Sequence, residues 1–203
     1  MKRGIGLKDS AEIILRSDYK SKIMFYPVRE VQILGGVKYG KGNVFGWVRK
    51  KGTKAHQGWD FAARDNTPLY AVADGEILYV DKVDDSRYGK SILMSFTGGY
   101  GETFYAFYAH INSNLVEKYD TVMAGDLIGY SGSTGNAKES DRWEQHLHFE
   151  FRSERNCGTG LEGRIDPQMF FGPPPFAWMC GGEITTNYQV LAFEGNAMSM
   201  SAY

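Results

Sequence analysis

His146-Leu147-His148-Phe149-Glu150-Phe151 is the stretch that decides the fold, because polar and apolar residues alternate along it. Side chains two residues apart on a β-strand point to the same face, so this alternation predicts a half-buried strand. One face would place the apolar residues in a core, and the other would present His146 and His148 together. Glu150 shares the histidine face, where it could orient a metal ligand, but a solvated carboxylate is the interpretation that we favour.

The other two histidines of the chain lie upstream, in His56-Gln57-Gly58-Trp59-Asp60 and in Tyr108-Ala109-His110. Imidazole and carboxylate are suitable zinc ligands, and a catalytic zinc normally takes three protein ligands plus water. His56 and Asp60 would supply two ligands, and one histidine of the His-x-His pair would supply the third. The remaining histidine of the pair and His110 would then be free for proton transfer and charge stabilisation. The His-x-x-x-Asp and Tyr-Ala-His motifs are weak by themselves, and His-x-His on an alternating strand is moderately specific for a metal. The weight comes from their order and from the absence of any other histidine.

The rest of the chain is predicted to be rich in strands. Glycine is frequent, with 25 residues, and β-branched and aromatic residues recur in short runs between turn signals. Helical patterns are few: Ser10–Arg16 is predicted to form a helix, and Ile111–Tyr119 a short helical turn. Besides the histidine strand, the predicted strands are Leu69–Val72, Gly75–Val80, Ser91–Phe96, Thr103–Tyr108 and Leu127–Tyr130.

Charge and composition exclude several classes of protein. The chain has 23 basic and 24 acidic residues, so it lacks the basic surplus of a nucleic-acid-binding protein. Its hydrophobic content of 42% is enough for a core, yet no apolar stretch reaches membrane-spanning length. Met1-Lys2-Arg3 is not followed by an apolar segment, so no signal peptide is visible. The basic residues Arg49, Lys50, Lys51 and Lys54 are interpreted as a solvated loop, with a rim that contacts an anionic polymer as the alternative.

The domain organisation is predicted to be one domain with two extensions. Asp166-Pro167 closes the regular part, and Gly172-Pro173-Pro174-Pro175 is typical of a stiff linker. We therefore divide the chain into an N-terminal extension (1–40), a central domain (41–171), and a Pro-rich linker with a C-terminal tail (172–203).

The two cysteines, Cys157 and Cys180, leave two alternatives open. Their separation excludes a Cys-x-x-Cys metal site. They are either two free buried thiols or one disulfide that ties down the C-terminal region, and a disulfide would require an oxidising compartment.

Taken in order, these motifs resemble the lysostaphin-type (LytM-like) zinc endopeptidases, which cleave the peptide part of bacterial peptidoglycan. The resemblance runs from about Phe45 to Asp166. It implies a mainly β fold, with an antiparallel β-sheet groove related to the barrel-sandwich hybrid unit, short helices and loop-rich termini. Beyond the histidine motifs it rests on Phe45-Gly46-Trp47-Val48-Arg49, Thr67-Pro68-Leu69-Tyr70-Ala71-Val72-Ala73-Asp74-Gly75, Ala124-Gly125-Asp126-Leu127-Ile128-Gly129 and Ser131-Gly132-Ser133-Thr134-Gly135-Asn136.

The resemblance also implies roles for individual residues. His56, Asp60 and His148 would hold one Zn²⁺ per chain, and His146 would be the general base, assisted by His110. The family also uses a tyrosine or similar donor to stabilise the oxyanion, which has no secure position in this sequence. The approach to His146 departs from the family, because residues 138–145 are longer than usual. A surface insertion is the interpretation we favour for them, and a loop on the groove rim is the alternative.

By this resemblance the chain would be a zinc-dependent metalloprotease that hydrolyses peptidoglycan cross-links, with D-alanyl stem-peptide cross-links favoured over glycine bridges. The alternative is a non-catalytic binding module or an activator of other cell-wall hydrolases, which the complete set of motifs disfavours. The site of action would be extracytoplasmic, in the periplasm or cell wall or after secretion or injection. A lysin or an antibacterial effector would also admit a cognate inhibitor or immunity protein. The expected partners are stem or cross-bridge peptides, without nucleic acid, and the expected state is a monomer.

Overall fold

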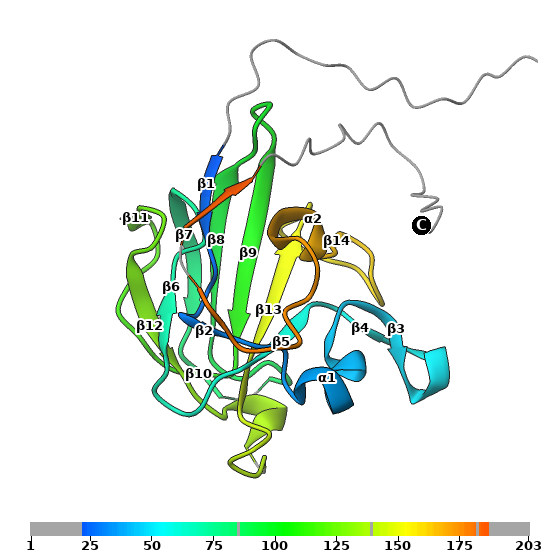
Figure 1. Ribbon diagram of the computed structural model, residues 1–203. Coiled ribbons are helices and arrows are strands. Elements are labelled where there is room, and N and C mark those ends of the chain that lie inside the picture. Colours follow the sequence, from blue (N-terminus) through cyan, green and yellow to red (C-terminus); the bar gives the residue numbers. More distant parts are fainter. Residues whose placement is uncertain (1–21, 85, 139, 182, 187–203) are drawn as a thin grey trace, which may run out of the picture.

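The computed structural model describes residues 22–84, 86–138, 140–181 and 183–186, which form a mainly antiparallel β structure (Figure 1). Its largest sheet has seven strands in the order β11-β7-β8-β9-β13-β14, and β5 also pairs with β13. Because β9 occupies one edge of β13, β5 and β14 share the other edge, end to end. The strands of this sheet are β5 (Trp59–Ala62), β7 (Gly75–Asp81), β8 (Ser91–Thr97), β9 (Thr103–Ala109), β11 (Thr121–Val122), β13 (His146–Arg152) and β14 (Arg164–Ile165).

Smaller sheets and short helices complete the described part of the chain. A three-stranded antiparallel sheet has the order β10-β12-β6, with β6 (Pro68–Tyr70), β10 (Ile111–Asn114) and β12 (Leu127–Ser131). Three strand pairs join β1 (Lys22–Phe25) to β16 (Glu183–Thr186), β2 (Glu30–Val31) to β15 (Met179–Cys180), and β3 (Gly46–Arg49) to β4 (Lys54–His56). The helices are α1 (Gly36–Tyr39), α2 (Gln168–Phe171), η1 (Gly40–Asn43), η2 (Lys50–Gly52) and η3 (Gly135–Ala137).

The six strands predicted from the sequence all overlap observed strands, namely β6, β7, β8, β9, β12 and β13. The prediction of a helical turn in Ile111–Tyr119 is wrong. Its first four residues form β10 instead, because pairing with β12 sets Ile111 opposite Ser131 and buries the Ile111 side chain. The predicted helix Ser10–Arg16 lies outside the described residues.

The core lies against the apolar face of β13. Leu147, Phe149 and Phe151 are fully buried, and the Phe151 ring lies 4.3 Å from that of Phe170 between centroids. The same core includes residues that precede position 41, so the core packing does not stop at the proposed boundary after residue 40. The division of the chain at 40 and 172 stays a prediction. These N-terminal core residues are Met24, Tyr26, Val28, Val31 and Ile33.

Both cysteines are free thiols, so the disulfide is not formed. Cys157 is half-buried and Cys180 is exposed, which means that neither is the buried thiol of the other alternative. No helix in the described part of the chain is long and apolar enough to span a membrane.

Candidate metal centre

The strand register brings the predicted site together. On β13, His148 lies opposite Asp60 of β5 on one side and opposite Ala109 of β9 on the other. Since β9 ends at Ala109, His110 is the first residue after that strand and lies close to His148. Between His56 and Asp60 the chain passes so close to β13 that a Cβ on Gly58 would lie 2.0 Å from the Phe149 carbonyl oxygen. Only glycine permits this approach, which explains the glycine inside the His-x-x-x-Asp motif.

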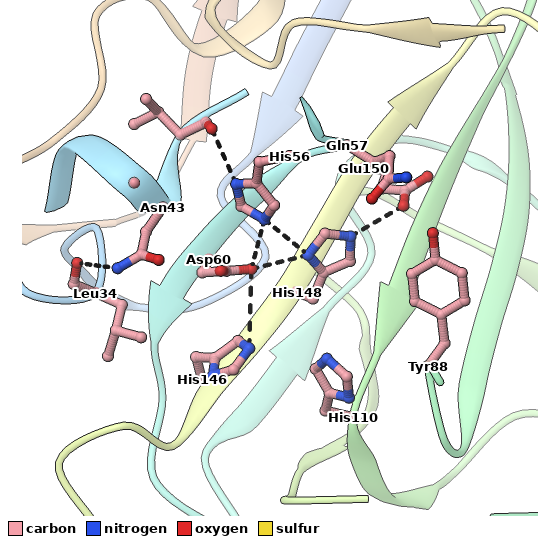
Figure 2. Close-up of polar contacts among 12 residues, drawn as sticks. Leu34, Asn43, His56, Gln57, Asp60, Tyr88, His110, His146, His148 and Glu150 are labelled. Carbon is pink, nitrogen blue, oxygen red and sulfur yellow. Dashed lines mark hydrogen bonds and ion pairs between the residues drawn. The ribbon is translucent and has the colours of Figure 1, made fainter. Parts of the chain in front are cut away.

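Three side chains converge on one point, as Figure 2 shows. His56 Nε2 lies 3.1 Å from Asp60 Oδ1 and 3.2 Å from His148 Nδ1, and His148 Nδ1 lies 2.8 Å from the same carboxylate oxygen. All three residues are buried, and their ligand atoms lie within 4.8 Å of one another. Two imidazole nitrogens and one carboxylate oxygen are a donor set suited to a divalent cation such as zinc. The structure thus assembles the three residues that the family resemblance assigned to a metal.

Backbone carbonyls set the protonated nitrogen of three histidines, because a carbonyl oxygen can only accept a hydrogen bond. His56 Nδ1 donates to Val44 O (2.9 Å), His146 Nδ1 to Glu144 O (2.7 Å), and His110 Nδ1 to Thr134 O (2.8 Å). In the neutral ring each Nε2 then carries the lone pair. Nε2 of His56 faces the ligand cluster, and Nε2 of His146 lies 3.8 Å from Asp60 Oδ1.

Glu150 orients the fourth histidine. Its Oε1 accepts from His148 Nε2 at 2.9 Å, which leaves His148 Nδ1 for the cluster, and its Oε2 accepts from Arg152 Nε (2.7 Å) and Arg164 Nε (3.0 Å). Burial raises the pKa of Glu150, but the hydrogen bond from His148 and the charges of His148, Arg152 and Arg164 outweigh it and lower the pKa to about 2. The expectation of a solvated Glu150 is wrong, because the side chain is fully buried among these three cationic partners.

Asp60 is held from outside the cluster by Arg49, which the sequence placed in a solvated basic loop. Arg49 Nη2 donates to Asp60 Oδ2 at 2.5 Å and to Asn43 Oδ1 at 3.2 Å. The second carboxylate oxygen is thereby occupied, so Oδ1 alone faces the two imidazoles. Burial raises the pKa of Asp60, but the charges of His146 and His56 and the hydrogen bonds of His148 and His56 hold it well below its usual value.

His110 and His146 lie together beside the cluster, with ring centroids 5.1 Å apart. His110 has a φ of 60°, a left-handed conformation that is uncommon for a residue with a side chain and recurs at functional sites. Burial lowers the pKa of His110 to about 4, helped by the nearby charges of His146 and His148. It is therefore neutral near pH 7.

The cluster faces a groove of about 340 Å³ whose walls come from distant parts of the chain. Ser140 and Glu144 line it, so the described part of the approach to His146 contributes to the rim and is not the simple surface insertion that we favoured. Tyr88, which the sequence did not single out, also lines the groove, with its ring centroid 5.6 Å from that of His148. Its hydroxyl accepts from Arg87 Nη2 at 2.9 Å. No local pattern marks Tyr88, because it reaches the groove from the loop between β7 and β8.

Comparisons with known proteins identify the family of the chain. A family model described as Peptidase family M23 matches residues 54–159. The DD-carboxypeptidase/endopeptidase Mpg of Neisseria meningitidis serogroup B is 34% identical over 99 residues, which cover 49% of this chain and 20% of Mpg. The peptidoglycan DD-endopeptidase ShyC of Vibrio cholerae is 33% identical over 103 residues, 48% of this chain and 20% of ShyC. The chain thus spans about a fifth of the length of these curated relatives.

Among solved structures, the catalytic domain of the prophage-encoded M23 protein EnpA of Enterococcus faecalis aligns with a TM-score of 0.49 and 22% identity, over 64% of this chain and 88% of that one.

Proposed function

Since the chain belongs to peptidase family M23, we propose that it is a zinc-dependent endopeptidase that hydrolyses peptide cross-links of bacterial peptidoglycan. The observation that carries the proposal is the convergence of His56, Asp60 and His148 ligand atoms within 4.8 Å at the wall of a groove. Two relatives described as peptidoglycan or DD-specific endopeptidases support the substrate class.

His56, Asp60 and His148 would hold the zinc ion. A zinc ion there would polarise the scissile carbonyl and lower the pKa of a bound water toward neutrality. His146 is the proton acceptor, because its Nδ1 hydrogen is committed to Glu144 O and its bare Nε2 faces Asp60. His110 is neutral and also presents a bare Nε2, since its Nδ1 hydrogen is committed to Thr134 O. Because a neutral imidazole with a bare Nε2 can accept a hydrogen bond there, we propose that His110 assists His146 in the proton transfer.

We further propose that D-alanyl stem-peptide cross-links are preferred over glycine bridges and that the enzyme acts outside the cytoplasm, in the periplasm or cell wall. A lysin or an injected antibacterial effector that meets a cognate inhibitor remains compatible with this activity. The alternative, a binding module that activates other hydrolases, is less well supported, because all three ligand residues and both accessory histidines are present in the site.

The test is digestion of purified muropeptides of both cross-link chemistries, with products identified by mass spectrometry. We expect the zinc-loaded protein to cleave the D-alanyl cross-link, and His146→Ala to keep its fold and zinc but lose about 10²–10⁴-fold in turnover. Equal turnover by His146→Ala would remove the assigned base. A protein that binds peptidoglycan without zinc and without shortening it would establish the binding module instead.

A further inference from the structure

Three cationic side chains line the groove, and two of them are not neutralised by the protein. Arg49 is bonded to Asp60. Lys54 and Arg87 also line the groove, and neither forms an ion pair within the described ranges of the chain. The groove therefore offers two free positive charges to whatever enters it.

The backbone that carries Arg87 is fixed to the site. The Arg87 carbonyl accepts from Asn136 N at 3.0 Å, and the Tyr88 carbonyl accepts from His110 N at 2.9 Å. The next residue, Gly89, has a φ of 60°, and a Cβ there would lie 2.4 Å from Gly135 N. This turn is packed so closely that Arg87 starts from a rigid support, although its side chain is exposed.

The Arg87 guanidinium is held in one orientation by two neighbours. Its Nη2 donates to the Tyr88 hydroxyl at 2.9 Å and to Gln57 Oε1 at 3.4 Å, and its Cζ lies 4.8 Å from the Tyr88 ring centroid. Tyr88 in turn packs against His148. Figure 2 shows Tyr88 and Gln57 on the His148 side of the cluster, away from His146. Arg87 thus lines the groove and is bonded to two residues of this His148 side.

From this placement we infer that Arg87 is a specificity-determining residue that binds a free carboxylate of the substrate peptide next to the scissile bond. The inference rests on the proposed function and names its substrate class: anionic cross-links rather than uncharged glycine bridges. A guanidinium has five N–H donors, and the contacts to Tyr88 and Gln57 use only those of Nη2. The N–H groups of Nη1 and Nε remain for charge-assisted hydrogen bonds to a carboxylate. Glu144 also lines the groove, and its backbone carbonyl accepts from His146 Nδ1, so a carboxylate near His146 would meet a side chain of like charge.

The experiment uses two cross-linked muropeptides that differ only in the diamino acid at the scissile bond, which carries either a free carboxylate or a carboxamide. We expect the zinc-loaded wild type to prefer the carboxylate about tenfold in kcat/KM, mainly through KM, the effect of one charge-assisted contact at a partly solvated site. Arg87→Gln should lose this preference and keep both its zinc and its activity on the carboxamide. Lys82→Gln is the matched control, because Lys82 is exposed and pairs with Glu117 outside the groove.

Three outcomes overturn the inference: no preference in the wild type, an equal loss on both peptides in Arg87→Gln, or a preference that disappears in Lys54→Gln but persists in Arg87→Gln. If the wild type cleaves neither peptide, the proposed function fails, and binding decides about Arg87 separately. Titration of the ¹⁵N-labelled chain with each peptide should then show about tenfold tighter binding of the carboxylate form, abolished by Arg87→Gln. Equal affinities would refute the subsite without reference to catalysis.

Discussion

Replacing Glu150 by Gln tests whether the buried carboxylate behind His148 supports the metal centre. The substitution keeps the shape of the side chain but not its charge or its four acceptor positions. An amide can accept from His148 Nε2 only if its NH₂ group faces Arg152 and Arg164, which sets donor against donor. In the opposite orientation the two arginines keep an acceptor and His148 faces the NH₂ group. Either way, at least one of the three contacts at 2.7–3.0 Å is lost.

The magnitude follows from burial. Glu150 is 0% exposed, and the side chains of Arg152 and Arg164 are each 7% exposed, so water cannot replace the lost partner. Removing one member of a buried charge network costs about 3–5 kcal/mol. For a chain of this size each kcal/mol corresponds to a few degrees, so we expect the melting temperature of Glu150→Gln to fall by about 10 °C. Zinc affinity should fall about 10–100-fold, because His148 loses the group that directs its Nδ1 lone pair to the cluster.

Thermal unfolding followed by circular dichroism, with and without zinc, measures the first effect, and competition with a chelator measures the second. Glu154→Gln is the matched control, since Glu154 is an exposed carboxylate four residues further along the chain. It should melt and bind zinc like the wild type. A melting temperature for Glu150→Gln within about 2 °C of that control would refute the reasoning, because so small a shift corresponds to less than about 1 kcal/mol.

Three further predictions concern two of the ligands and the residue that anchors one of them. Asp60→Asn should weaken zinc binding more than about 100-fold at an unchanged fold, since it removes a charged ligand; zinc content near one per chain after dialysis would contradict it. Arg49→Gln should weaken zinc binding about tenfold, because Oδ2 of Asp60 loses its anchor; an unchanged chelator competition curve would show that the contact is dispensable. In the metal-free protein, burial lowers the pKa of His148, but bonds to Asp60 and Glu150 prevail and raise it to about 9. Its folded pKa then lies above its unfolded value of 6.5, so this stabilisation is complete below pH 6.5 and is lost as the pH rises through 9, which melting curves in chelator between pH 6 and 10 would reveal.

Local residue patterns were sufficient to predict six of the strands, among them β13, which carries two of the site histidines. The alternation from His146 to Phe151 has the two-residue period of a strand, and it placed the histidines on one face and the aromatic residues in the core. The ligand types at His56 and Asp60 are also a local property, because side-chain chemistry does not depend on the fold. The choice of five site residues therefore followed from sequence alone, and the structure brings all five into one groove.

Contacts between distant segments decided what the sequence could not predict. From the sequence we predict a solvated Glu150, but in the structure Arg164 of β14 donates a hydrogen bond to it. From the sequence we predict that Arg49 belongs to a solvated basic loop, but the pairing of β3 with β4 places its guanidinium against Asp60. Ile111 belongs to a strand only because β12 pairs with it. In each case the partner is separated along the chain, and charge compensation or backbone pairing across that separation overrides the preference of the residue taken alone. A local pattern specifies which face a side chain occupies, whereas the tertiary structure specifies what meets it there.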